Sequence, residues 1–212
     1  MEKIFIIGAG GFGREVLWLI ERINSLNPMW EVVGFIDDGV DIGTIIDGIQ
    51  VVGTTDELID TKEKVSVVCA VGSAKVRKKI IENVSRNNNI KFPNIIDPSS
   101  ISSRYIEMGQ GNIVCASNVF TVNIRIGNFN ILNLSCTIGH DVEIGDFNTI
   151  YPGVNVSGGV KLGNCVELGT GSKIIQGKNI GDNTIVGAGA VIIRDIDGEC
   201  TVVGVPGYKR KK

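Results

Sequence analysis

The sequence lacks a long apolar run, a strong net charge and any closely spaced pair of cysteines. The opening apolar run, "IFII", is four residues long and leads into glycines, which is too short for a signal peptide or a membrane span. The formal net charge of -2 gives no electrostatic reason to expect nucleic acid as a partner. The five cysteines show no C-x-x-C spacing, which argues against a disulfide framework and a zinc site. We therefore expect a cytoplasmic protein with no metal, no membrane insertion and no nucleic-acid partner.

Histidine is the scarcest side chain of all. His140 is the only histidine among the 212 residues, and it lies in the stretch "TIGHDVEIG", residues 137–145. An unperturbed imidazole titrates at a pH of about 6.5, so it can accept a proton at neutral pH. The stretch therefore offers a candidate general base, and an ordinary surface histidine is the alternative.

The first part of the chain alternates strand-like and helix-like patterns. "KIFIIGAGG" is an apolar run ended by glycines, "FGREVLWLIERIN" has helical spacing, and "WEVVGFIDD" is an apolar run ended by acids. The later runs "GIQVVGT" and "VSVVCAVGS" are each followed by a polar or helical stretch. Strands and helices in alternation predict a small parallel α/β sheet.

The glycine-rich stretch "GAGGFG", residues 8–13, follows a predicted strand and opens a predicted helix. In this context backbone N–H groups and a helix N-terminus can bind a phosphate. Asp37 follows Gly13 by 24 residues, close to the spacing of an acid that binds a ribose, and taken alone this suggests NAD. A dinucleotide fold needs two mononucleotide halves, however, and the alternating pattern ends after roughly 95 residues. A single half favours a nucleoside diphosphate, as in a UDP- or dTDP-sugar.

From about residue 100 a six-residue repeat replaces this alternation. Glycine often follows the repeated apolar residue, where we expect a sharp corner that needs an unhindered backbone. A six-residue period with a turn in each unit predicts a β-solenoid with three units, or eighteen residues, per coil, and it stacks Asn130 under Asn148. The repeated apolar residues are Val114, Phe120, Ile126, Leu132, Ile138, Ile144, Ile150, Val156, Leu162, Leu168, Ile174, Ile180, Val186 and Ile192.

The two patterns meet near "NIIDPSS", where Pro93 and Pro98 stand. We expect two domains, residues 1–95 and residues 96–212. A helical second domain is excluded, because its frequent glycines would cost about 1 kcal/mol each in a helix. A sandwich of ordinary hairpins is excluded because the longer two-residue alternation is missing.

The hexapeptides resemble those of the left-handed β-helix acyltransferases, which are typically trimers with active sites between neighbouring subunits. The order "GAGGFGREV", "GFIDD", "AVGSAKVRKKI", "IGHD" and "VVGVPGYKRKK" is similar to the family of PglD-type nucleotide-sugar N-acetyltransferases and NeuD-type sialic acid O-acetyltransferases. The resemblance covers essentially the whole chain. It implies a Rossmann-like α/β domain that binds the acceptor, followed by a left-handed parallel β-helix that forms a homotrimer and binds acetyl-CoA.

The resemblance also implies a catalytic role for His140, as the general base that takes a proton from the acceptor during its attack on the thioester of acetyl-CoA. Asp141 would orient the imidazole, although adjacent strand residues tend to point apart and a solvated corner residue is the alternative. Asn133 would lie near the histidine. The expected cofactor-binding residues are Gly158, Thr170, Gly187, Ala188 and Lys209, where turning a corner is the alternative role for the small residues. The expected acceptor-binding residues are Gly11, Phe12, Asp37, Asp38, Gly72 and Arg77.

Two positions depart from the pattern of the family. Many relatives have Gly-Gly-His-Gly in the glycine-rich loop, where this chain has Phe12. Relatives often have His-Pro before the repeats, where this chain has Asp97 and Pro98. Both positions lie on the expected acceptor side, so the identity of the acceptor stays open.

The expected function is acetyl transfer to the amino group of a nucleotide-linked amino sugar, in bacterial surface-glycan synthesis. An O-acetyltransferase that acts on a sialic acid or another sugar hydroxyl is one alternative. A non-catalytic, nucleotide-binding trimeric module is the other.

Overall fold

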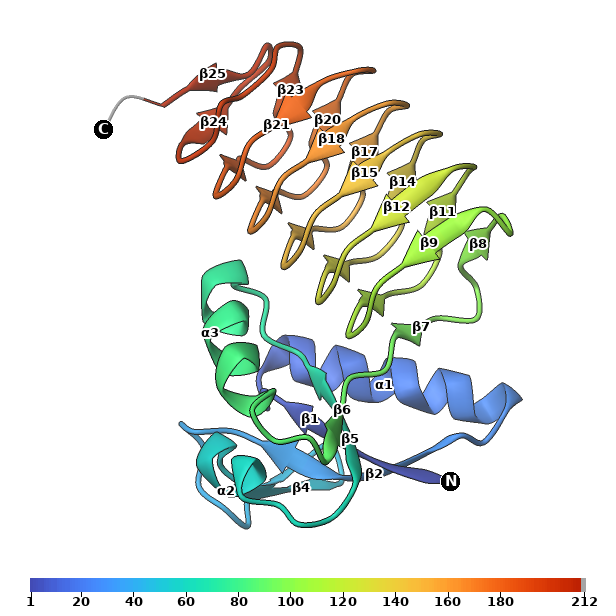
Figure 1. Ribbon diagram of the computed structural model, residues 1–212, viewed down its shortest axis with the longest axis vertical. Coiled ribbons are helices and arrows are strands. Elements are labelled where there is room, and N and C mark those ends of the chain that lie inside the picture. The colour runs from blue at the N-terminus through green and yellow to red at the C-terminus, as the bar shows by residue number, and fades with distance from the viewer. Residues whose placement is uncertain (211–212) are drawn as a thin grey trace. The chain divides into compact units, whose positions relative to one another are not determined.

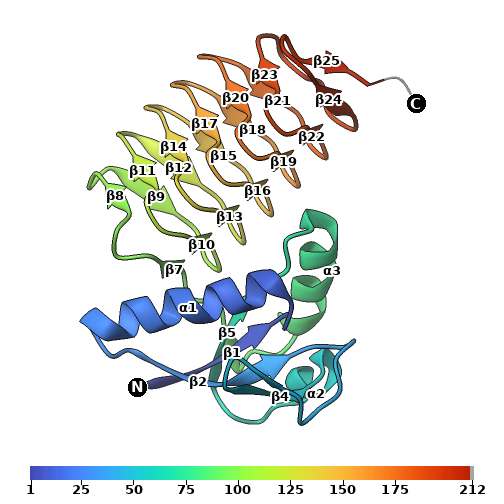
Figure 2. The same cartoon turned by 180° about the vertical axis from the view of Figure 1, so that it is seen from behind.

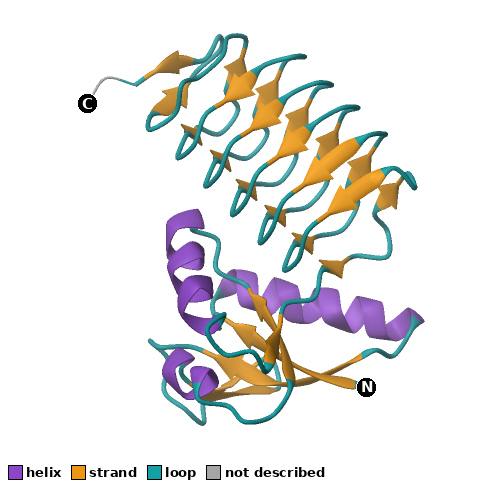
Figure 3. Ribbon diagram, viewed as in Figure 1, coloured by secondary structure: helices purple, strands orange, loops and turns teal. Residues whose placement is uncertain are grey.

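The computed structural model describes residues 1–210, and residues 211 and 212 lie outside the described part (Figure 1). The chain divides into two compact units, Met1–Pro98 and Ser99–Lys212. Within the described residues, the first unit holds all the helices and the second is built from short strands and turns (Figure 3). None of the described helices is long and apolar enough to span a membrane.

The first unit is a parallel α/β sheet of six strands, which confirms the expected fold class. The order is β3-β4-β2-β1-β5-β6, and every pair is parallel except the short hairpin of β3 and β4. The strands are β1 (Glu2–Ile7), β2 (Trp30–Ile36), β3 (Ile45–Ile46), β4 (Ile49–Gly53), β5 (Val65–Cys69) and β6 (Ile90–Lys91), followed by β7 (Ile95–Ile96). The helices are α1 (Gly11–Leu26), α2 (Thr55–Ile59) and α3 (Ala74–Val84).

Helix α1 packs its apolar face inward because its buried residues recur at helical spacing. Gly13, Val16, Leu17 and Ile20 are all buried, at the i, i+3, i+4 and i+7 positions of one face. A Cβ atom on Gly13 would collide with the carbonyl oxygen of Gly8, so the close crossing of α1 over the end of β1 requires glycine there. The glycine-rich stretch is therefore partly a packing device.

The second unit is a left-handed β-solenoid with three strand faces, as predicted (Figure 2). Leu132 pairs with Ile150, and Ile138 with Val156, so these coils take eighteen residues each, whereas Ile185 pairs with Thr201 and the last coil takes sixteen. The first face contains β10 (Ile113–Val114), β13 (Ile131–Leu132), β16 (Thr149–Ile150), β19 (Glu167–Leu168), β22 (Ile185–Val186), β24 (Thr201–Val203) and β25 (Tyr208–Lys209). The second contains β8 (Ile101–Ser102), β11 (Val119–Phe120), β14 (Thr137–Ile138), β17 (Asn155–Val156), β20 (Lys173–Ile174) and β23 (Val191–Ile192). The third contains β9 (Ile106–Met108), β12 (Ile124–Ile126), β15 (Glu143–Ile144), β18 (Lys161–Leu162) and β21 (Asn179–Ile180).

Three columns of corners connect these faces. We call the corner after the first face the first corner, the corner after the second face the second corner, and the corner after the third face the third corner. Each repeated apolar residue points into the coil, and the residue four positions later often does so too, as at Cys136 and Val154, which are both 0% exposed. These two positions in each unit fill most of the interior.

The glycine after each repeated residue is needed because the backbone there is crowded, as expected. A Cβ on Gly139 would lie 2.6 Å from the backbone nitrogen of Gly158 in the next coil. The close approach of stacked coils selects glycine there. The left-handed residue of the corner lies two positions later, as at Ser135, Asp141 and Phe147 (φ 58°, 58° and 59°).

A buried asparagine ladder ties the coils together, and it confirms the predicted stacking of Asn130 under Asn148. The backbone N–H of Asn130 donates to Oδ1 of Asn112 (2.9 Å), that of Asn148 to Oδ1 of Asn130 (2.8 Å), and that of Val166 to Oδ1 of Asn148 (2.7 Å). All three asparagines are 0% exposed. Each side chain therefore satisfies a backbone donor that the turn leaves without a strand partner.

We predict that Asn130→Ala lowers the free energy of unfolding by about 1–3 kcal/mol, because it leaves the buried N–H of Asn148 without an acceptor. The midpoint of chemical unfolding measures this. The control is Asn155→Ala, which removes only a bond from Nδ2 to Oγ1 of Thr137 near the surface (2.9 Å), and its effect should be under about 1 kcal/mol. Equal losses in the two variants would contradict a structural role for the ladder.

Candidate active site

The candidate catalytic side chain lies at the second corner of the solenoid. His140 is the second residue after β14, following Ile138 and Gly139. Its side chain is 53% exposed, so it points out of the coil while Ile138 points in. The repeat thus fixes the backbone of His140 and leaves its ring accessible.

Asp141 is hydrogen bonded to the ring, which is the arrangement that the resemblance implied and that strand alternation alone disfavoured. Nδ1 of His140 lies 2.8 Å from Oδ2 of Asp141. The left-handed backbone of Asp141 (φ 58°) ends the strand alternation, and this lets both side chains lie on the same side of the corner. Because the carboxylate accepts a hydrogen bond from Nδ1, the proton of the neutral imidazole lies on Nδ1. The lone pair that can accept a proton is then on Nε2.

Asn123, one coil before Asp141, completes this group. Its Nδ2 donates to Oδ1 of Asp141 at 3.3 Å. The hydrogen bond to His140 and, secondly, the one from Asn123 lower the pKa of Asp141. The carboxyl group is therefore an ionised acceptor at neutral pH, which suits it to support a positively charged imidazolium.

The imidazole lies against Gly158 of the next coil. A Cβ on Gly158 would be 2.5 Å from Nε2 and 2.6 Å from Cε1 of His140, and the carbonyl oxygen of His140 accepts the N–H of Gly159 at 2.7 Å. Beyond Gly158 the corner carries no side chain at Gly159 or Gly177, whose φ values are 65° and 70°. The coil that adjoins the imidazole therefore presents only backbone at Gly158 and Gly159.

The other residues that the resemblance assigned to catalysis and cofactor binding lie elsewhere on the solenoid. Asn133 follows β13, so it belongs to the first corner, and its Oδ1 accepts the N–H of Leu134 at 2.7 Å. Thr170, Gly187 and Ala188 follow β19 and β22, at the same first corner. Within one chain the first corner and the corner of His140 are therefore separate columns.

Lys209 lies in the last described strand. β25 pairs with β24 in an antiparallel sense, with Lys209 opposite Val202, and the backbone N–H of Arg210 donates to the oxygen of Thr201. The side chain of Lys209 is exposed. The last coil thus fixes the backbone of this lysine, and its ammonium group reaches solvent.

In the first unit, Gly11 and Gly72 lie at the carboxyl edge of the sheet without a packing reason to be glycine. A Cβ at either position would meet nothing within 4 Å, and neither has a left-handed backbone. Because β1 and β5 are parallel neighbours, the loops that follow them share one edge of the sheet. Small residues that the fold does not require are typical of a place where a ligand approaches the backbone.

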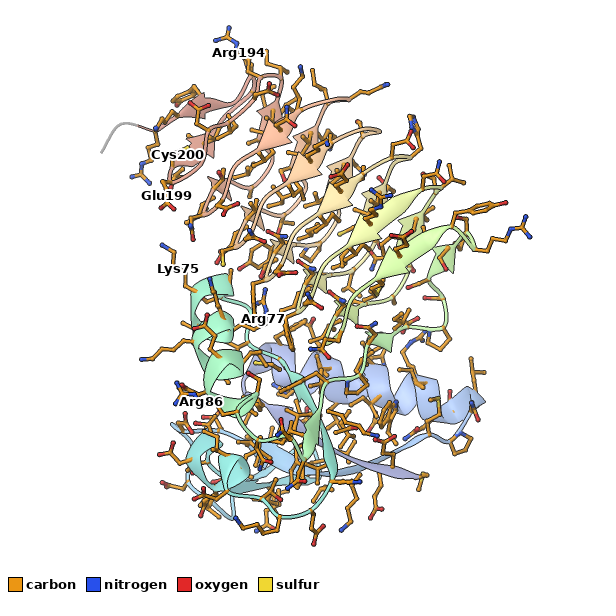
Figure 4. The ribbon with its side chains drawn as sticks, in the orientation of Figure 1. Lys75, Arg77, Arg86, Arg194, Glu199 and Cys200 are labelled. Atoms are coloured by element: carbon orange, nitrogen blue, oxygen red, sulfur yellow. The ribbon has the colours of Figure 1, made fainter. Side chains whose placement is uncertain are left out.

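Two helix N-termini open at this same edge. No side chain caps α1 or α3, and neither has an acid in its first turn, whereas Thr54 and Glu57 form a capping box on the short α2. Uncapped N-terminal N–H groups attract anions. Lys75, labelled on the first turn of α3 in Figure 4, is exposed and adds a positive charge. Lys75 was not among the predicted site residues, and the available signal for it was its place in the first turn of the helix that follows "AVGS".

The expected acceptor-binding acids already bind backbone groups. Asp37 accepts the N–H of Ala9 at 2.8 Å and that of Gly39 at 2.9 Å, so it ties the glycine-rich loop to the end of β2. Asp38 accepts the N–H of Thr55 at 2.8 Å, at the start of α2. Both acids therefore shape the loops around the edge of the sheet.

Arg77 is 1% exposed, so it supports the loop after β5 from inside the unit (Figure 4). Its Nη1 donates to the carbonyl oxygens of Val71 (2.7 Å) and Gly72 (3.0 Å). Cys69 lies nearby, and burial raises the pKa of its thiol to about 12 despite the positive charge of Arg77. The geometry gives Arg77 the role of shaping the loop.

The two departures from the family pattern have different surroundings. Phe12 is half-buried at the start of α1. Asp97 is 1% exposed and accepts two hydrogen bonds from Arg22, at 2.6 and 3.1 Å, and Arg22 stacks over the ring of Trp18 at 5.1 Å. Asp97 therefore anchors the end of the first unit to α1, while Phe12 lies close to the edge that Gly11 opens.

The thiols and metal-ligand groups of the described residues offer no alternative chemistry at the second corner. Burial raises the pKa of Cys136, in the core of the solenoid, to about 11, so it holds its proton at neutral pH. No group of three or more histidine, cysteine or acidic side chains among residues 1–210 is placed to hold a metal ion. His140 and Asp141 are thus the polar pair that the corner provides for proton transfer.

Comparison with known proteins places this geometry in a family. The family described as "PglD N-terminal domain" matches residues 3–84. The acetyltransferase domain of PglB from Neisseria gonorrhoeae, solved with acetyl coenzyme A, is 30% identical over 99% of each chain, with a TM-score of 0.89. No curated protein sequence matches the chain significantly.

Two further structures are similar over their whole length. PerB from Caulobacter crescentus, solved with CoA and GDP-perosamine, is 27% identical over 100% of this chain and 98% of its own, with a TM-score of 0.88. WeeI from Acinetobacter baumannii is 28% identical over 99% of this chain and 100% of its own, with a TM-score of 0.89. The fold and these matches define an acyltransferase of the hexapeptide-repeat class. The chain belongs to the PglD-type family of sugar acetyltransferases.

We predict that Gly158→Ala lowers the rate of acetyl transfer by about tenfold or more, because the new methyl group displaces the imidazole from its productive position. Steady-state kinetics with thiol detection measures the effect. Gly145→Ala is the control: its Cβ would be equally crowded, 2.6 Å from the oxygen of Gly163, but at the third corner. If both variants lose stability alike and neither loses kcat, the contact between His140 and Gly158 has no catalytic role.

Proposed function

We propose that this protein transfers the acetyl group of acetyl-CoA to the amino group of a nucleotide-linked amino sugar, with His140 as the general base. The observation that carries the proposal is the pairing of His140 with Asp141 at an exposed corner, where the imidazole lies against Gly158. The N. gonorrhoeae relative was solved with acetyl coenzyme A, and the C. crescentus relative with CoA and GDP-perosamine. These ligands supply a donor and an acceptor of the kind that the proposal requires.

The chemistry is a direct transfer between the two substrates. The neutral amine attacks the thioester carbonyl and loses its proton to Nε2 of His140, the carbon–sulfur bond breaks, and the imidazolium returns the proton to the departing thiolate. Asp141 holds Nδ1–H and stabilises the imidazolium charge. No acyl-enzyme forms, in line with the protonated and buried thiol of Cys136.

The complete site, in this proposal, forms between subunits of a homotrimer. Asn133, Thr170, Gly187 and Ala188 lie at the first corner, and His140 lies at the second. In a ring of three identical chains each contact joins two different surfaces of neighbouring subunits. In this proposal the two surfaces are the first corner of one subunit and the second corner of the next. The pantetheine arm would lie in that groove, with Lys209 or Arg210 near the phosphates of the nucleotide.

The acceptor binds, in this proposal, at the carboxyl edge of the sheet in the domain of residues 1–95, while residues 96–212 bind the donor and form the trimer. The open glycines Gly11 and Gly72, the two uncapped helix N-termini and Lys75 all favour a diphosphate. Asp37 and Asp38 shape the surrounding loops, and Phe12 contacts the ligand through its ring. We place the enzyme in the cytoplasm, in agreement with its five free cysteines, and in bacterial surface-glycan synthesis.

We predict that His140→Ala lowers kcat by about a hundredfold or more, because it removes the proton acceptor from the transition state. Acetyl transfer over a panel of amino sugars, followed by thiol release, measures this. The affinity for the nucleotide sugar should not change, since that ligand binds to the first unit. Unchanged kcat would make the assignment of the base wrong. No acetyl transfer by the unchanged protein with any acceptor would favour a non-catalytic binding module.

We predict that at least one member of a panel of UDP-, dTDP-, GDP- and CMP-sugars raises the melting temperature. A ligand that binds only the native state adds about 2.7 kcal/mol at a hundred times its Kd. No shift with any member would contradict the nucleotide-sugar proposal. Products identified by mass spectrometry distinguish acetylation on nitrogen from acetylation on oxygen.

We predict that Gly11→Val weakens binding of the active nucleotide sugar by about tenfold or more, because its side chain fills the space beside the N-terminus of α1. The unliganded melting temperature should hardly change, since nothing lies within 4 Å of a Cβ there. Isothermal titration of the variant and of the unchanged protein measures the difference. Equal affinities would exclude this edge of the sheet as the diphosphate site.

A further inference from the structure

We propose that Asn123 is a positioning residue for the general base, acting on His140 through Asp141. This inference rests on the proposed function, in which His140 accepts the proton of the acceptor. Oδ2 of Asp141 is bound to Nδ1 of His140 at 2.8 Å, and Oδ1 of the same carboxylate accepts Nδ2 of Asn123 at 3.3 Å. The three side chains form a chain of hydrogen bonds that ends at the reactive ring.

The solenoid places Asn123 one coil below Asp141 in the same column of the second corner. The column contains the left-handed residues Asn123, Asp141, Gly159 and Gly177, spaced eighteen apart. The backbone N–H of Asp141 donates to the oxygen of Val122 at 3.1 Å, which fixes the spacing of the two coils. The amide of Asn123 is thus presented to Asp141 by the repeat itself.

Asp141 depends on Asn123 because little else restrains its carboxylate. Its side chain is 59% exposed, and among residues 1–210 only His140 and Asn123 provide side chains that are hydrogen bonded to it. A bond to each oxygen fixes the plane of the carboxylate, and the plane of the carboxylate sets the direction from which it meets Nδ1–H. Asn123 therefore helps to hold the imidazole over Gly158 with its lone pair on Nε2.

A cavity adjoins Asn123 and Asp141. It measures about 490 Å³ and is lined by Asn123 and Asp141 together with Arg104, Tyr105 and Arg125. If the amide of Asn123 is removed, water from this cavity can reach Oδ1 of Asp141. Water satisfies the carboxylate but does not orient it, so the loss should be partial.

The left-handed backbone of Asn123 (φ 55°) offers a purely structural explanation, because asparagine tolerates this conformation better than most residues. Glycine tolerates it at no cost and already occupies the same column at Gly159 and Gly177. Asn123→Gly therefore removes the amide and keeps the backbone. If conformation alone selected asparagine, this variant would be fully active.

The test combines kinetics with nuclear magnetic resonance of the imidazole, which needs no assignment because His140 is the only histidine. Asn123→Gly should lower kcat by about three- to tenfold, which is the effect expected from the loss of one hydrogen bond of ordinary strength. KM should stay nearly unchanged. The ¹⁵N shifts of the neutral ring should move from the form protonated on Nδ1 toward the form protonated on Nε2. Asp141→Asn should produce a larger change in the same direction, and combining it with Asn123→Gly should add little.

The control is Asn183→Gly at the third corner. Asn183 has the same backbone conformation (φ 56°), and its Nδ2 likewise donates to a carboxylate, Oε1 of Glu199, at 2.6 Å. This variant should leave both the kinetics and the ¹⁵N shifts of His140 unchanged. Normal kcat together with unchanged ¹⁵N shifts in Asn123→Gly would overturn the role of Asn123. Full activity of His140→Ala would instead overturn the proposed function, so the two failures are distinguishable.

Discussion

The stacking of coils at a fixed interval of eighteen residues is the constraint on which the second unit depends. Two-residue strands are too short to hold a sheet by themselves, so each coil relies on the coil before and after it. The fixed interval aligns buried residues such as Leu132 with Ile150 and places Asn130 under Asn148. It also restricts the glycines between coils, because a Cβ on Gly139 would meet the backbone of Gly158. The stacking interval thus accounts for the apolar packing, for the hydrogen bonds of the buried asparagines and for the glycines between coils.

The candidate site uses the same constraint at the second corner. The coil of His140 keeps its apolar residue inside, so the outward ring adds chemistry without disturbing the core. The next coil supplies Gly158, against which the ring lies, and the preceding coil supplies Asn123, which binds the carboxylate of Asp141. Three successive coils therefore determine the position of one imidazole. A rigid stack is a suitable support for a general base, since proton transfer depends on geometry within tenths of an ångström.

The sequence predicted the solenoid because its signal is periodic and local: each repeated residue, such as Ile138 or Ile144, must point inward. It also predicted the parallel sheet and the stacking of Asn130. It did not locate the left-handed corner residue, because that position is occupied by residues as different as Ser135, Asp141 and Phe147. The resemblance implied that Asp141 orients His140, but spacing alone did not, since strand alternation does not extend to a left-handed residue. Other features depend on tertiary neighbours that sequence spacing does not reveal. They are the burial of Arg77, the position of Lys75 at a helix N-terminus that attracts anions, and the hydrogen bond from Asn123 to Asp141.

The most direct test of the account is complementation between subunits, because the proposed site joins the second corner of one chain to the first corner of the next. His140→Ala disables the second corner, and Ala188→Trp blocks the first, so each homotrimer should be inactive. In mixed trimers formed by co-expression, every ring contains one junction of two intact corners. Random mixing then restores about a quarter of the normal sites. Recovery near that level is the predicted result, and no recovery from verified mixed trimers would contradict a site shared between subunits.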